Sequence, residues 1–154
     1  MKITREWAMP NKRTFQIKPI HNLICQYLST GIVLDPFPFD FKEDALEMLS
    51  RYSDGSVSIV RFDPPYSLRQ LKECYKNKGQ AITGDESRTI YTKWKDEIAR
   101  VLDINGICLS FGWNSNGLGK KRGFEIIEIL LVAHGGNHND TICTVERKIQ
   151  ETLE

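Results

Sequence analysis

Four consecutive residues, Asp63-Pro64-Pro65-Tyr66, carry the groups best suited to chemistry in this 154-residue chain. Proline has no N–H, so the segment is rich in hydrogen-bond acceptors, a carboxylate and carbonyl oxygens, and poor in donors. The tyrosine supplies an aromatic face. These groups suit a ligand that presents an amino group attached to a flat ring. The segment therefore predicts a binding corner for such a ligand.

The segment directly follows an apolar run, residues 57–62, that predicts a β-strand. Two successive prolines cannot continue a strand ladder, so the strand must end at Asp63. In an open α/β sheet, ligands bind beyond the carboxyl ends of the strands. A second short β-branched run, residues 32–34, ends in Asp35-Pro36. The position of the corner therefore favours a binding site over the plainer alternative, a strand-ending turn with a packed tyrosine.

The elements that position this corner alternate along the chain. Apolar residues at helical spacing predict three helices, and apolar runs predict five strands. The helices are expected at residues 19–28, 44–52 and 89–102, and the strands at 32–34, 57–62, 107–111, 126–133 and 141–145, with a turn at 105–106. We expect residues 1–16 to form an arm and residues 67–86 a mobile loop. This alternation predicts an α/β fold in which helices pack on a sheet.

The length and charge of the chain limit the class of protein. One domain over residues 1–154 is expected, because domains cluster near this size and 40% of the residues are hydrophobic. Lys and Arg total 21 against 20 Asp and Glu, which excludes a histone-like protein or an acidic disordered tail. No apolar run approaches the ~18 residues of a membrane span, and the N-terminus is charged. We therefore expect a cytoplasmic protein without a membrane partner.

The residues also raise a metal site and a phosphate-binding loop as alternatives. The four cysteines contain no C-x-x-C pair, so reduced cysteines are expected rather than a zinc site. His134, His138 and Asp140 could form a metal cluster, but a glycine-rich loop with two histidines more often connects strands. Residues 112–121 have the glycine spacing of a P-loop, but Leu118 stands where lysine is required. No metal and no nucleoside triphosphate are therefore expected.

The Asp-Pro-Pro-Tyr segment resembles the catalytic motif of the amino-group DNA methyltransferases, which methylate N6 of adenine or N4 of cytosine with S-adenosylmethionine. The initial Asp is typical of the adenine branch. The resemblance extends over most of the chain and points to small phage and prophage enzymes. The other segments that carry it are Lys18-Pro19, Asp35-Pro36-Phe37, Asp44-Ala45-Leu46, residues 106–121 and residues 128–140. It implies a Rossmann-like methyltransferase fold without a separate target-recognition domain.

The resemblance also implies roles for individual residues. Asp63, Pro64, Pro65 and Tyr66 are expected to be catalytic. Tyr66 stacks on a flipped adenine, while the Asp63 carboxylate and the Pro64 carbonyl accept its amino hydrogens. The methyl group is then transferred in line, without a metal or a covalent intermediate. The implied cofactor contacts are Lys18, Pro19, Asp35, Pro36, Phe37 and Asp44. The expected DNA contacts, on the same side as the corner, are Arg69, Lys72, Asn114, Asn116, Lys120, Lys121 and Arg122.

The chain departs from the family pattern after Asp35-Pro36-Phe37. The family continues into a small-residue loop, a helix and a second strand whose acid contacts the cofactor ribose, whereas here Asp44-Ala45 follows almost at once. A parallel crossover needs a dozen or more residues, so the fold is expected to be shortened on the cofactor side. Two alternatives stay open: an inactive relative that binds DNA or a partner protein, and a methyltransferase for RNA or a protein side chain. A homo-oligomer is expected, because a shortened sheet leaves an edge and an apolar face.

Overall fold

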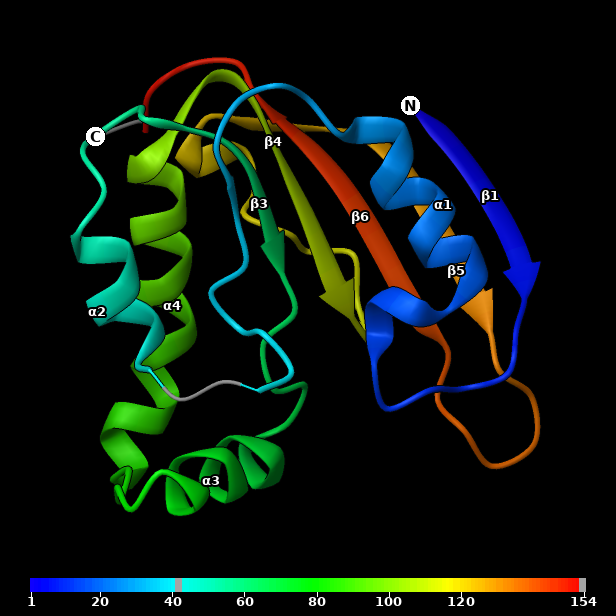
Figure 1. Ribbon diagram of the computed structural model, residues 1–154, viewed down its shortest axis with the longest axis horizontal. Helices are drawn as coiled ribbons and strands as arrows, with labels where there is room; N and C mark the ends of the chain where they lie inside the picture. Colours follow the sequence, from blue (N-terminus) through cyan, green and yellow to red (C-terminus); the bar gives the residue numbers. More distant parts are fainter. Residues whose placement is uncertain (41–42, 153–154) are drawn as a thin grey trace.

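The strands of the protein form one mixed sheet with helices on both faces (Figure 1). The computed structural model describes residues 1–40 and 43–152, and within them the strand order is β1-β5-β6-β4-β3-β2. The strands are β1 (Lys2–Trp7), β2 (Val33–Leu34), β3 (Val57–Phe62), β4 (Leu102–Gly112), β5 (Phe124–Ala133) and β6 (Thr141–Lys148). The helices are α1 (Lys18–Tyr27), α2 (Ala45–Ser50), α3 (Leu68–Asn77) and α4 (Gly84–Val101), with 3-10 turns η1 (Thr14–Gln16) and η2 (Lys120–Arg122). The α/β class is confirmed, and the Rossmann-like topology stays a prediction.

Every strand of this sheet except β6 runs in the same direction. β1 is parallel to β5, and β2, β3 and β4 are parallel to one another. β6 lies between β4 and β5 and is antiparallel to both. The carboxyl ends of β1 to β5 therefore meet at one edge of the sheet, toward which the arrowheads of β1, β3, β4 and β5 point in Figure 1. We call this the carboxyl edge, and the opposite one the amino edge.

Helices cover both faces of the central strands, whose side chains are buried on both sides. On one face, α2 and α4 pack Leu49, Trp94 and Ile98 over β3 and β4. On the other face, α1 packs Ile20 and Leu23 against β4, β5 and β6. These two layers fix the ends of β3 and β4, which hold the corner at residues 63–66.

The prediction of a mobile loop over residues 67–86 is wrong, because these residues form α3 and the start of α4. The Ser67 side chain accepts a hydrogen bond from the Gln70 N–H and so begins α3. Thr83 and Glu86 form a reciprocal capping box at the start of α4. Only Leu71 and Tyr75 of α3 are buried, so the helix has too narrow an apolar stripe to stand out from its polar composition.

Two further local predictions are corrected by long-range pairing. Residues 2–7 of the expected arm form β1, because their backbone pairs with β5 although no side chain of β1 is fully buried. Asn105-Gly106 does not turn the chain but lies inside β4. Asn105 has a positive φ of 69°, and the register between β3 and β4 shifts nearby, so the segment forms an irregularity in a continuous strand.

The connection from β4 to β5, residues 113–123, contains no α-helix. Connections between strands that run in the same direction usually carry one, and it covers the sheet. On the face of the sheet where α4 packs, the helix covers β3 and β4. The part of this face formed by β6, β5 and β1 is covered by no helix of the described residues. Ile129, Leu131 and Ile142 on that half are only partly buried, and Ile3 is 65% exposed. We call this uncovered part of the sheet, formed by β6, β5 and β1, the open half-face.

The strand at the other side of the sheet, β2, is short. β2 has two residues and pairs only with β3 among the described strands. The chain then passes from Asp35 to α2 without a further strand in residues 35–40 and 43–44.

None of the helices in the described ranges is both long and apolar enough to cross a membrane.

Candidate functional site

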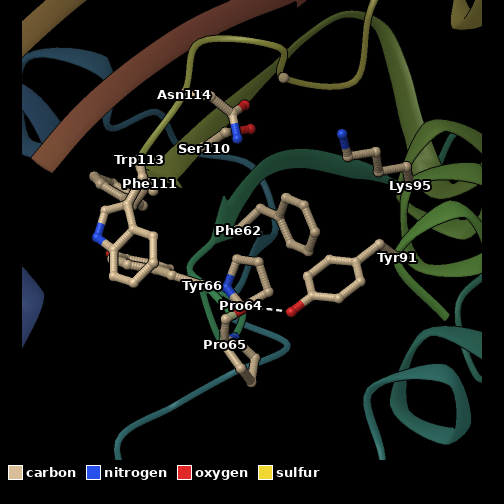
Figure 2. Close-up of a pocket in the computed structure, with 12 residues that line it drawn as sticks. Phe62, Pro64, Pro65, Tyr66, Tyr91, Lys95, Ser110, Phe111, Trp113 and Asn114 are labelled. Carbon is tan, nitrogen blue, oxygen red and sulfur yellow. Dashed lines mark hydrogen bonds between the residues drawn. The ribbon is translucent and has the colours of Figure 1, made fainter. Parts of the chain in front are cut away.

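The Asp63-Pro64-Pro65-Tyr66 corner connects the end of β3 to the start of α3 at the carboxyl edge. The Tyr91 hydroxyl of α4 donates a hydrogen bond to the Pro65 carbonyl, as Figure 2 shows. The Tyr66 N–H donates to the Gln70 side chain at 2.7 Å. Within the described residues, the Pro64 carbonyl makes no hydrogen bond. The corner is therefore held from two helices while one of its carbonyl acceptors stays available.

The Asp63 carboxylate is partly buried and held by two hydroxyl groups. The Tyr66 hydroxyl donates to Asp63 Oδ1 at 2.6 Å, and the Thr14 side chain also hydrogen-bonds Asp63. Burial raises the pKa of Asp63 to about 6, and the two hydrogen bonds partly oppose this shift. The pKa of Tyr66 is raised, chiefly by burial and then by the Asp63 charge, so its hydroxyl stays protonated. Asp63 can therefore exchange a proton near neutral pH.

Two cavities meet at the corner, and Pro64, Pro65 and Tyr66 line both. The corner cavity, about 100 Å³, lies toward α4 and β4 and is also lined by Tyr91, Lys95, Ser110, Trp113 and Asn114 (Figure 2). The arm cavity, about 530 Å³, is lined on its other side by Lys12, Thr14, Phe37, Phe39, Gln70 and Cys74. Asp63 lines the arm cavity. Two ligands bound in these cavities would face each other across the corner.

An aromatic ring from the end of β4 stands beside the corner. Trp113 follows the last residue of β4, and its ring meets the Tyr66 ring edge-on, with centroids 5.8 Å apart and planes at 74°. Figure 2 shows the two rings side by side. Trp113 is 44% exposed, so it is not a core residue. A flat ligand in the corner cavity can contact both rings.

The residues that the family resemblance assigns to the cofactor are only partly brought together. Phe37 lines the arm cavity. The Asp35 carboxylate accepts the Phe37 N–H at 3.1 Å and lies 3.8 Å from the Arg61 guanidinium. Burial raises the pKa of Asp35, and Arg61 opposes this shift. Pro36 and Pro19 are buried, and Lys18 is exposed at the start of α1.

Asp44 lies apart from the corner. Its Oδ1 accepts N–H groups of Leu46 and Glu47 at the start of α2, and its Oδ2 accepts the Tyr75 hydroxyl at 2.9 Å. It lines a separate cavity of about 420 Å³ with Tyr75, Gln80, Glu86 and Lys93. α3 divides the two, since Cys74 lines the arm cavity and Tyr75 the other.

Sequence reasoning missed Lys12 and Thr14, which reach the arm cavity from the turn before α1. η1 brings Thr14 to Asp63, although almost fifty residues separate them along the chain. No local pattern marks these two residues. Their proximity to the corner depends on how α1 packs against the sheet.

The expected DNA contacts are divided between the two edges of the sheet. Arg69 and Lys72 are exposed on α3, directly after the corner, and Asn114 lines the corner cavity. Asn116 is exposed in the same connection. Lys120, Lys121 and Arg122 form η2 immediately before β5 begins, and therefore lie at the amino edge.

We expected these three basic residues on the same side as the corner, but the structure places them at the amino edge. Residues 113–119 carry the chain back along the sheet before η2, because β5 must start at the amino edge to run parallel to β4. Arg122 there donates to Asp96 at 2.7 Å and to the Leu118 carbonyl at 2.9 Å. A role of Lys120 and Lys121 in DNA binding stays a prediction.

The histidine loop does not gather metal ligands. Among the residues that the structure describes, no group of three His, Cys, Asp or Glu side chains could hold a metal ion. The His134 ring hydrogen-bonds the Ala8 carbonyl and the Thr141 hydroxyl, each at 2.8 Å. His134 therefore ties the end of β1 to β6.

Comparison with known proteins gives structural similarity only. No family model and no curated protein matches this chain. Two crystal structures of a candidate DNA modification methylase from Thermus thermophilus, one a selenomethionine derivative, are similar to it, with TM-scores of 0.46 and 0.47 and 16% identity. The match covers 81% of this chain and 56% or 57% of the other. The chain thus spans little more than half the length of the protein that it matches.

Proposed function

We propose that this protein transfers the methyl group of S-adenosylmethionine to the N6 amino group of adenine in DNA. One observation carries the proposal: an acceptor-rich corner separates a small cavity with aromatic walls from a larger cavity that contains a carboxylate. The corner cavity suits a flat base, and the arm cavity suits the methyl donor. The motif resemblance at residues 63–66 supports adenine as the base.

The side chains of the arm cavity fit the amino-acid half of S-adenosylmethionine. Lys12 matches a carboxylate, and the Phe37 ring and the Asp63 carboxylate match a positively charged sulfur. The ribose half has no acidic partner on a strand beyond β2 in the described residues, because β2 is the outermost strand on that side of the sheet. When bound, this cofactor would supply an activated methyl group to a nitrogen held at the corner.

The residues of the corner orient the amino group and take its proton. An adenine must leave the duplex stack to enter the corner cavity, at a cost of a few kcal/mol. The Tyr66 ring turns to stack on it, which frees Asp63 Oδ1 from the Tyr66 hydroxyl. Asp63 and the Pro64 carbonyl then accept the two amino hydrogens, so the nitrogen lone pair is no longer conjugated with the ring. After transfer, Asp63 can accept the released proton, since its pKa is about 6.

The test is transfer of labelled methyl groups from S-adenosylmethionine to unmethylated DNA. We expect label as N6-methyladenine with the wild type and a loss of about 100-fold or more with Asp63→Ala. Asp85→Ala, which removes an exposed carboxylate from the first turn of α4, is the control and should leave the rate unchanged. Transfer that survives Asp63→Ala would exclude the proposed role of the corner, and label in RNA alone would identify RNA as the substrate.

A second candidate, a catalytically inactive protein that binds DNA or a partner, is favoured by the short β2 edge. Such a protein would bind DNA through α3 and the corner but would not bind the cofactor. Isothermal titration with S-adenosylmethionine separates the two candidates. Measurable binding that Lys12→Ala weakens supports the enzyme, and no binding at high protein concentration supports the inactive protein.

A further inference from the structure

A further cavity lies beside the corner cavity at the carboxyl edge. This flank cavity, about 420 Å³, is lined by Trp113, Leu131, His138, Asn139, Asp140 and Ile142. None of the expected DNA contacts or cofactor contacts is among these residues. The loop from β5 to β6 supplies the rim, and two strands supply the floor.

The floor of the flank cavity is part of the open half-face of the sheet. Leu131 of β5 and Ile142 of β6 are register partners, and both are partly buried. They stay accessible because the connection from β4 to β5 carries no α-helix. At the rim, Gly135 and Gly136 adopt positive φ angles of 70° and 56°, which turn the loop tightly enough to bring residues 138–140 back over the floor.

The Trp113 side chain forms the wall between the flank cavity and the corner cavity, and it lines both. Its position follows from the register, because Gly112, the residue before it, pairs with Ile142. A single indole ring therefore separates the two cavities. Two neighbouring flat groups on one ligand could occupy them with that ring between or beside them.

The chemistry of the flank cavity suits a nucleobase. Its floor is apolar, its wall is aromatic, and its rim carries an amide and an imidazole. His138 and Asn139 are exposed, and within the described residues their side chains make no hydrogen bond. Asp140 is already engaged, since its Oδ1 accepts the His134 N–H at 3.3 Å. Aromatic rings stack on any base, and Asn side chains read the polar edges of bases.

We propose that the flank cavity binds the nucleobase next to the target adenine and that His138 and Asn139 select which base it is. The inference rests on the proposed function, because it takes the corner cavity as the site of the target base. It assigns sequence preference to the loop from β5 to β6.

The first experiment measures the flanking-base preference of methylation. Random-sequence DNA is methylated, and the bases on either side of each N6-methyladenine are determined. We expect the wild type to prefer one base at one neighbouring position by about tenfold or more, and His138→Ala/Asn139→Ala to lose that preference. His21→Ala/Asn22→Ala, an exposed pair of the same residue types on α1, should keep it. A wild type without a flanking preference, or a rim variant that keeps it, overturns the inference.

The second experiment requires no catalysis. Binding of single-stranded oligonucleotides with one adenine and an abasic position on its 5′ or 3′ side is measured by fluorescence anisotropy. Wild type should lose about tenfold in affinity for one of the two abasic strands, and Trp113→Ala should bind both as it binds the intact strand. Trp113→Phe should restore the difference. Equal wild-type affinity for all three strands overturns the inference. A difference without methyl transfer would reject the proposed enzyme while the flank cavity stands.

Discussion

The Asp63 carboxylate is less easily ionised in the folded chain than in the unfolded one. Its pKa is about 6 in the structure, because burial disfavours the charge, against about 4 for an exposed aspartate. Between these values the folded chain keeps a proton that the unfolded chain releases. The contribution of Asp63 to the free energy of unfolding therefore falls as pH rises through this window.

Asp63→Asn should consequently stabilise the protein at neutral pH. The amide accepts the Tyr66 hydrogen bond without a buried charge, so we expect a gain of about 1–3 kcal/mol in the free energy of unfolding near pH 7.5. Near pH 4 the gain should vanish, because Asp63 is then protonated. Urea denaturation at both pH values measures the difference. The exposed Asp54→Asn is the control, and an equal effect of the two substitutions would contradict the explanation.

The same titration predicts the pH dependence of the proposed methyl transfer. Only the ionised carboxylate can accept the proton that the methylated amino group releases, so kcat/KM should fall about tenfold per pH unit below the pKa of Asp63, about 6. Above that value the rate should be level until another group titrates. Rates measured from about pH 5 to 8 on one DNA substrate test this, and a flat profile would show that Asp63 does not act through its charge.

At the residue scale, the sequence predicts where the strand before the corner ends, because that signal is local, while the role of the corner stays a prediction. The strand expected at residues 57–62 is confirmed as β3 and ends directly before Asp63. Two prolines follow Asp63, and Ser67 then caps α3. Lys12, Thr14 and Trp113 reach the site through the packing of separate segments, which residue spacing does not encode. Their approach to the corner could therefore not be predicted from the sequence.

At the element scale, the connection from β4 to β5 depends on one buried carboxylate. Glu146 of β6 accepts the N–H groups of Leu118 and Gly119 at 2.7 and 3.0 Å. Burial raises the pKa of Glu146, and these hydrogen bonds partly oppose the shift. They hold the returning segment against the sheet, although no α-helix is present to do so.

Gly117 makes this arrangement possible and is the place to test it. Its φ is +52°, and a Cβ atom there would lie 2.2 Å from Glu146 Oε2, whose side chain is buried and bonded. Gly117→Ala should therefore cost about 2–4 kcal/mol in the free energy of unfolding, since it adds a steric clash to backbone strain. Gly79→Ala has a similar φ of +71° but open space, so it should cost about 1 kcal/mol. Urea denaturation compares the two, and equal losses would mean that Glu146 yields freely.

The elements that the sequence predicts correctly are those with a clear apolar pattern. The runs at residues 126–133 and 141–145 are confirmed as parts of β5 and β6, and the helix expected at 89–102 is confirmed as part of α4 up to Val101. β1 is missed because its stability comes from pairing with β5. α3 is missed because it depends on the Ser67 cap and on a narrow apolar stripe. Neither signal exceeds the polar composition of its own segment.

At the scale of the whole molecule, the outer edge of β1 is unpaired within the described residues. Ile3 and Trp7 on this strand are 65% and 64% exposed. Antiparallel pairing with a second copy about Thr4 would place Lys2 opposite Glu6 twice, and it would extend the open half-face across both copies. We therefore expect a dimer formed through β1.

Light scattering tests this expectation. Ile3→Lys/Trp7→Lys should convert the dimer to a monomer, because charges on an edge strand oppose pairing between chains. Leu28→Lys, an exposed apolar position next to α1, should leave the mass unchanged. A wild type that is monomeric at high concentration would reject dimerisation through β1.

The sheet order is the feature furthest from sequence-based prediction. An alternation of helices and strands predicts an α/β sheet, but not that β6 enters antiparallel between β4 and β5. Nor does it predict that β1 lies beside β5. These placements depend on which apolar faces cover each other once the chain is assembled.

The pairing of β1 with β5 also has a consequence for biosynthesis. Lys2 pairs with Glu128, so the ribosome makes β1 on the order of 100 residues before its partner. At ordinary translation rates this interval is on the order of ten seconds. During that time the β1 backbone has no strand partner, and it carries the exposed side chains of Ile3 and Trp7. We therefore expect the yield of soluble protein to depend on chaperones that bind short apolar segments near the N-terminus.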